Sequence, residues 1–125
     1  MKSYLLSRAA ETDIEQILRD TKSTFGKQQK TIYKNIINRA LDMIGLEPNR
    51  ASSWDREDLL PGLRAFHLEH AAGRLGAASH CVYYEETKLP GGMPGAAVFR
   101  ILHDAMEPKY HIYRGRENRS TILVR

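Results

Sequence analysis

The sequence has very little cysteine and no long apolar run. Its single cysteine, Cys81, excludes an intrachain disulfide and fits a reducing compartment. Near the start of the chain, the apolar run at residues 4–6 is too short for the core of a signal peptide. No other stretch is apolar over the ~20 residues that a transmembrane helix needs. We therefore expect a cytoplasmic protein that does not enter a membrane.

The motifs of several enzyme classes are absent as well. The pair Gly91-Gly92 lacks the lysine and the following helix that a phosphate-binding P-loop requires, and the sequence has no nucleophile elbow. His67 and His70 are three residues apart on a predicted strand, so they would point to opposite faces and not share a metal ion. We therefore expect neither a metal site nor a cofactor.

The positive charge is concentrated at the C-terminal end. The chain has 125 residues and a net charge of +4. Residues 113–125 carry four arginines against one glutamate, a net charge of +3, which leaves +1 for residues 1–112. We predict one folded domain over residues 1–112, with no direct binding of nucleic acid. Residues 113–125 are expected to be a basic, disordered extension, with a weak strand at residues 120–124 as the alternative.

The most apolar part of the sequence predicts the centre of a sheet. Residues 96–102 are apolar except for Arg100, which is typical of a strand that is buried on both faces. After this strand, Asp104 can cap a short helical turn at residues 105–111. A cation inside a buried strand is costly unless it is paired or placed for use, which makes Arg100 a residue of interest.

Helical periodicity precedes the predicted sheet. A short strand at residues 2–7 is followed by apolar stripes over residues 9–25 and 27–44, with Gly26 between them and Gly45 as the expected terminator. These stripes predict an antiparallel helical hairpin.

The rest of the chain predicts antiparallel strands. A polar loop at residues 46–62, with Trp54 folded back onto the domain, leads to strands at residues 63–70 and 80–86, and a turn at 88–95 precedes the central strand. The fold class is therefore α+β: an N-terminal strand and a two-helix hairpin packed on a three- to four-stranded antiparallel sheet. The opposite sheet face and the open edges would be available to a partner.

Two kinds of site are compatible with this arrangement. A ribonuclease would need cations for the phosphate and groups that transfer protons, which the following side chains could supply: Arg64, Arg100, His103, Tyr110 and His111. The structural alternative is that both arginines pair with acidic side chains such as Glu69 or Asp104, and that His80 and His103 are hydrogen-bonded core residues.

A binding module is the second kind of site. A groove between the sheet and the helical hairpin could take a partner helix or an extended peptide. Four aromatic residues could line it: Tyr33, Phe66, Tyr83 and Tyr84. The structural alternative is that these aromatic side chains belong to the core.

Over residues 2–112 the sequence resembles the ParE toxins of bacterial toxin–antitoxin pairs, within the wider RelE/ParE group. The matching pieces, in order, are Tyr4-Leu5-Leu6-Ser7 with Ala10 and Asp13-Ile14, then Ile17, Phe25-Gly26, Tyr33, Gly62-Leu63-Arg64, His80-Cys81-Val82-Tyr83-Tyr84, Arg100-Ile101-Leu102-His103 and Met106-Glu107-Pro108. The segments at residues 70–79 and 88–95 look longer than in the family. Residues after 113 have no family counterpart.

The resemblance implies a toxin of a plasmid-stabilisation type that is neutralised by a ParD-like antitoxin, for which the four aromatic residues are the predicted contacts. The typical target of ParE toxins is DNA gyrase, whereas RelE-type relatives cut mRNA on the ribosome. A net acidic segment at residues 54–58 and the long helical hairpin favour the non-enzymatic ParE type. The alternatives are a ribosome-dependent mRNA endonuclease that uses the five candidate residues, and an inert relative that keeps only antitoxin binding.

Overall fold

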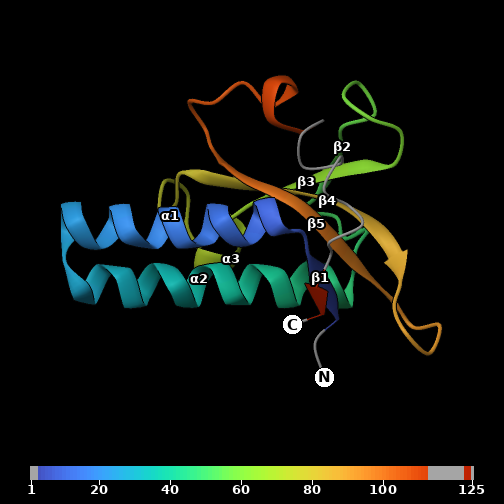
Figure 1. Ribbon diagram of the computed structural model, residues 1–125, viewed down its shortest axis with the longest axis horizontal. Coiled ribbons are helices and arrows are strands. Elements are labelled where there is room, and N and C mark those ends of the chain that lie inside the picture. Colours follow the sequence, from blue (N-terminus) through green and yellow to red (C-terminus); the bar gives the residue numbers. More distant parts are fainter. Residues whose placement is uncertain (1–2, 113–122, 125) are drawn as a thin grey trace.

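The computed structural model describes residues 3–112 and 123–124. Figure 1 shows a helical hairpin beside a twisted sheet, with the helices covering one sheet face. The elements in chain order are β1 (Tyr4–Leu6), α1 (Arg8–Phe25), α2 (Lys27–Leu46), β2 (Trp54–Asp55), β3 (Leu63–His67), α3 (Glu69–Ala72), β4 (His80–Lys88), β5 (Pro94–His103) and β6 (Leu123–Val124).

The predicted helical hairpin is confirmed. Helices α1 and α2 lie side by side and are joined at Gly26, whose φ of 93° lies in the region that favours glycine (Figure 1). Helix α1 begins after Ser7, whose hydroxyl accepts a hydrogen bond from the Ala10 amide at 3.0 Å. The two helices bury one shared apolar stripe, because neither stripe is stable in water alone.

Gly45 does not terminate α2, which continues to Leu46. A Cβ atom at Gly45 would lie 2.7 Å from the carbonyl oxygen of Ser3, and one at Gly95 of β5 would lie 2.5 Å from the same oxygen. These two glycines therefore allow the chain before β1 to pass between the helix and the strand. Residue 45 is therefore a glycine because the backbone of Ser3 approaches it closely, and not because the helix ends there.

The sheet has more strands than predicted and is mixed. Among the described residues six strands follow the order β2-β3-β4-β5-β1-β6, and β1 pairs with β5 in parallel. The parallel pair is possible because the long chain from α1 to β4 connects the two strands. Trp54 does not fold back: it lies in β2 opposite Ala65 and is 42% exposed. The strand predicted over residues 63–70 ends at His67, and helix α3 takes its last two residues together with the first two of the loop expected after it.

Both faces of the sheet carry apolar cores. On the helix-covered face, side chains of β1, β3, β4 and β5 pack against α1 and α2. The opposite face has its own cluster, made of Leu60, Leu63, Ala65, Cys81, Tyr83, Phe99, Leu102 and Ile112. The expectation of an open second face is therefore wrong, because Leu60 and the helical turn at residues 108–112 cover it. The central position of β5, buried on both faces, is confirmed.

The predicted C-terminal extension is described only in part. Leu123 and Val124 form β6, which pairs antiparallel with β1, and the other residues of 113–125 lie outside the described residues. Across residues 3–112 and 123–124, none of the helices combines the length and apolarity that crossing a bilayer requires. No group of three or more potential metal ligands occurs in this same part of the chain.

Candidate functional site

Arg100 forms a bidentate ion pair with Asp13 of α1. The guanidinium Nε and Nη2 atoms each lie 2.7 Å from a carboxylate oxygen, and the two side chains are 13% and 12% exposed. Nη1 also donates to the backbone carbonyl of His111 at 3.2 Å. The predicted pairing of Arg100 with an acidic side chain is correct in kind, but the partner is Asp13 and not Glu69 or Asp104.

The Asp13 carboxylate also bonds the backbone of β5, at the part of that strand that lies beyond its pairing with β1. The Ile101 amide donates to Asp13 at 2.9 Å, and the Ser7 hydroxyl donates to the Phe99 carbonyl at 2.8 Å. Both contacts lie at an irregularity in the β4–β5 pairing, next to Tyr83. Asp13 and Ser7 thus replace the missing strand partner, which gives Arg100 and Asp13 a structural role.

Arg64 lies in a different environment. It stands opposite Tyr84 in the β3–β4 ladder, and its Nε and Nη2 atoms donate to the Ser53 hydroxyl at 3.1 and 2.7 Å. A cavity of about 290 Å³ beside it is lined by Arg64 together with Asn49, Asp55, Glu57, Gly62, Leu63, Glu85 and Glu86. Four carboxylates around one guanidinium disfavour the binding of a phosphate.

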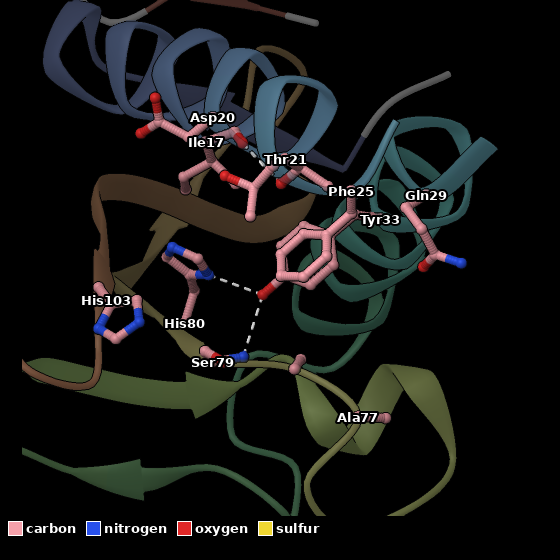
Figure 2. Close-up of a pocket in the computed structure, with 12 residues that line it drawn as sticks. Ile17, Asp20, Thr21, Phe25, Gln29, Tyr33, Ala77, Ser79, His80 and His103 are labelled. Carbon is pink, nitrogen blue, oxygen red and sulfur yellow. Dashed lines mark hydrogen bonds between the residues drawn. The ribbon is translucent and has the colours of Figure 1, made fainter. Parts of the chain in front are cut away.

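The largest described pocket lies between the hairpin and the end of the sheet where β4 begins and β5 ends (Figure 2). It has a volume of about 440 Å³. Its lining residues are Ile17, Asp20, Thr21, Thr24, Phe25, Gln29, Tyr33, Ala77, Ala78, Ser79, His80 and His103. The wall is mainly apolar and aromatic, and its described lining holds no lysine or arginine. Such a pocket suits a partner's side chain better than a phosphodiester.

A neutral hydrogen-bonded pair closes one side of this pocket. Figure 2 shows Tyr33 pointing from α2 toward His80 and Ser79. The Ser79 amide donates to the Tyr33 oxygen at 3.1 Å, and the tyrosine hydroxyl, 2.6 Å from His80 Nδ1, is placed to donate to that nitrogen. Burial, together with the nearby His103, lowers the pKa of His80 to about 4. Burial also raises the pKa of Tyr33, so both groups are neutral at pH 7.

Comparison with known proteins identifies the family. The family model described as "ParE toxin of type II toxin-antitoxin system, parDE" matches residues 4–108. The chain belongs to the ParE toxin family. Toxin ParE1 of Mycobacterium tuberculosis (strain ATCC 25618 / H37Rv) is 30% identical over 104 residues, which cover 83% of this chain and 91% of the relative. Toxin ParE1 of Caulobacter vibrioides (strain ATCC 19089 / CIP 103742 / CB 15) is 27% identical over 112 residues, which cover 90% of this chain and 99% of the relative.

In this ParE-family chain the five candidate ribonuclease residues do not meet in one pocket. Arg64 lies beside the acidic cavity and Arg100 is paired with Asp13. Of the three proton-transfer candidates, His103 alone lines the large pocket, where its ring centroid lies 5.1 Å from that of His80. Tyr110 is 71% exposed, and His111 contacts Arg100 through its backbone carbonyl.

The four aromatic residues predicted to contact the antitoxin lie on both sheet faces. Phe66 and Tyr84 belong to the helix-covered core and are fully buried, and Tyr83 is buried in the opposite cluster. Tyr33 alone reaches a pocket. No surface of the described chain therefore presents all four rings together, and antitoxin contact by Tyr33 stays a prediction.

Sequence reasoning missed Asp13, Ser53 and His80 as site residues. Asp13 lies on the polar face of α1, where a carboxylate is ordinary, and its partner is 87 positions away in the chain. Asp13 and His80 both belong to the quoted family pieces, which was the available signal for these two residues. Cys81 offers no chemistry, because burial raises the pKa of its thiol to about 12.

Proposed function

We propose that this ParE-family toxin acts without catalysis, by binding DNA gyrase in the cytoplasm, and that a ParD-like antitoxin neutralises it. The family assignment supports a toxin with an antitoxin partner. The observation that carries the non-enzymatic mechanism is the buried ion pair between Arg100 and Asp13. This pair removes one of the two cations that a phosphate-binding site would need.

The surroundings of the second cation support the same mechanism. Asp55, Glu57, Glu85 and Glu86 line the cavity beside Arg64. An RNA phosphate at this position would meet four negative groups. A protein partner that presents lysine or arginine would meet a favourable potential there instead.

The decisive experiment combines two assays on the same purified toxin. We expect inhibition of gyrase supercoiling, and we expect ribosome-bound mRNA to stay intact. Prior mixing with the antitoxin should abolish the inhibition, which serves as the control for specificity. Cleaved mRNA without inhibition of gyrase would overturn the proposal.

An mRNA endonuclease is the second candidate, because Tyr33, His80 and His103 bring proton-transfer groups to one pocket. His103→Ala is its sharpest test, since this side chain is exposed and its loss leaves the core unchanged. An endonuclease should lose cleavage of ribosome-bound mRNA in this variant. His70→Ala, another exposed histidine, is the matched control and should retain cleavage.

A further inference from the structure

Trp54 is an exposed aromatic residue that the core does not use. It is 42% exposed and lies outside both apolar clusters. Within residues 3–112 and 123–124, its ring makes no hydrogen bond and no contact with another ring. Its neighbour in the β2–β3 ladder is Ala65, whose single methyl group covers little of an indole. Packing therefore does not account for a tryptophan here, and tryptophan is enriched among the residues that dominate protein interfaces.

Hydrogen bonds on both sides of Trp54 hold its backbone in place. Before it, the hydroxyl of the buried Ser53 donates to the Arg50 carbonyl at 2.7 Å. After it, the Arg56 amide donates to the Leu63 carbonyl at 2.7 Å. The exposed ring thus stands on an ordered part of the sheet, so a partner that binds it has little backbone entropy to remove.

The same edge of the sheet carries an excess of negative charge. Successive residues of a strand point to opposite faces, so Asp55 points away from Trp54, toward the acidic cavity beside Arg64. Glu57 and Glu86 line this cavity with Asp55, and all three are exposed. Their carboxylates bond amide groups, and none of the three forms an ion pair with a described lysine or arginine. Arg64 offsets only one of these charges.

No described strand covers the outer side of β2. This strand is the last in the sheet order, and β3 is its one neighbour among the residues that the structure describes. A partner that lies along this edge therefore meets the indole on one face of the sheet and the carboxylates on the other. A cation near the face of an indole is attracted by its π-electrons, and a lysine or arginine beside it is attracted by the carboxylates.

We propose that Trp54, Asp55, Glu57 and Glu86, together called the tryptophan edge, form the surface through which this toxin contacts gyrase. The surface that the tryptophan edge binds is a lysine- or arginine-rich part of that enzyme. Gyrase acts on DNA, and proteins that act on DNA expose such cations to attract its phosphates. This inference rests on gyrase as the target in the proposed function, and not on the antitoxin partner.

Substitution of the ring is the first test. Trp54→Ala should raise the toxin concentration that half-inhibits gyrase supercoiling by about tenfold or more. Trp54→Phe keeps an aromatic face and should lose less than Trp54→Ala. Leu75→Ala, at an apolar side chain that is 85% exposed in another loop, is the matched control and should inhibit like the unmodified toxin. Circular dichroism and thermal unfolding verify that each variant is folded.

Removal of charge is the second test and leaves the ring in place. Glu57→Gln combined with Glu86→Gln keeps an oxygen acceptor for the amide bonds of both residues. This double variant should inhibit gyrase several-fold less than the unmodified toxin at low salt, and its inhibition should depend less on salt concentration. The control removes two exposed charges from the helices, by Glu15→Gln combined with Asp42→Asn, and should leave inhibition unchanged.

The outcomes distinguish the tryptophan edge from the proposed function. If the unmodified toxin does not inhibit gyrase, the proposed function is overturned. If it does, inhibition of equal strength by folded Trp54→Ala or by the Glu57 and Glu86 double variant would overturn the tryptophan edge alone. Equal losses in the two charge variants would overturn it as well, because any surface charge would then serve. If Trp54→Ala does not fold, the charge variants decide.

Discussion

Two polar clusters flank the inner part of the sheet and differ in charge. The first joins Asp13, Arg100 and the edge of β5 in a nearly buried ion pair. The second joins Tyr33, His80 and Ser79 at the wall of an open pocket, where both side chains are neutral at pH 7. The comparison teaches that a charged residue in a central strand serves the fold here, whereas the uncharged cluster stands at the surface that a partner can reach.

The largest effect is expected from breaking the charged cluster. Asp13→Ala should lower the free energy of unfolding by about 3 kcal/mol or more, because it leaves the Arg100 guanidinium buried without its counter-charge. Chemical denaturation measures this loss. Asp20→Ala, on the same helix but exposed, is the matched control and should cost less than about 0.5 kcal/mol. A loss below about 1 kcal/mol for Asp13→Ala would contradict the structural role.

A smaller effect is expected from acidification, through the neutral cluster. The unfolded His80 takes up a proton near its ordinary pKa of 6.5, whereas the folded ring does so only at about 4. Its contribution to stability is therefore complete above pH 6.5 and is lost as the pH falls toward 4.

Denaturation curves at several pH values test this dependence. His80→Asn keeps an acceptor for the Tyr33 hydroxyl and should flatten the pH dependence between these limits. Carboxylates also titrate in this range, so the difference from His70→Asn, an exposed histidine, is the relevant quantity. Identical curves for both variants would contradict a neutral, half-buried His80.

The third effect concerns the Tyr33 hydroxyl of the neutral cluster, which takes part in two hydrogen bonds. Tyr33→Phe should reduce the free energy of unfolding by about 1 kcal/mol, since it removes the hydroxyl that bonds both His80 and the Ser79 amide. Tyr110 has an exposed ring, so Tyr110→Phe should change the free energy of unfolding by only a few tenths of a kcal/mol. Thermal unfolding measures both variants under the same conditions. Equal unfolding midpoints would contradict the hydrogen bonds of the Tyr33 hydroxyl to His80 and Ser79.

The smallest effect is expected at the second arginine. Arg64→Met should cost less than about 1 kcal/mol, because its guanidinium bonds a serine hydroxyl and keeps no carboxylate in ion-pair contact in the described chain. Arg100→Met is the matched comparison and should cost several times more. If the two substitutions proved equally damaging when measured by urea denaturation, the contrast between the arginines would be refuted.

Local patterns predicted the parts of the fold that depend on nearby residues. The stripes of α1 and α2, the joint at Gly26 and the buried strand β5 follow from spacing within single segments. The parallel pairing of β1 with β5 and the short strand β2 do not, because they depend on contacts between distant segments. Gly45 shows the same limit, since its neighbour Ser3 is more than forty residues away.

The site was less predictable than the fold. An arginine within a buried strand indicates that a partner exists, but the pattern could not choose Asp13 of α1 from several acidic residues. Successive side chains of a strand point to opposite faces, so Tyr83 and Tyr84 lie in different cores, and one groove could not be lined by both. Tyr33 was proposed as one of four aromatic residues that could line a groove, and of these four it alone lines the described pocket.

Glycine is required for two unrelated reasons in this chain. At Gly45 and Gly95 the constraint is volume, because the Ser3 carbonyl occupies the place of a side chain. At Gly91 and Gly92 it is the backbone angle, with φ of 90° and 83° and no atom within 4 Å of an added Cβ. In a saturation-mutagenesis library, asparagine should survive selection in the second pair, whereas the first pair should accept no replacement at all.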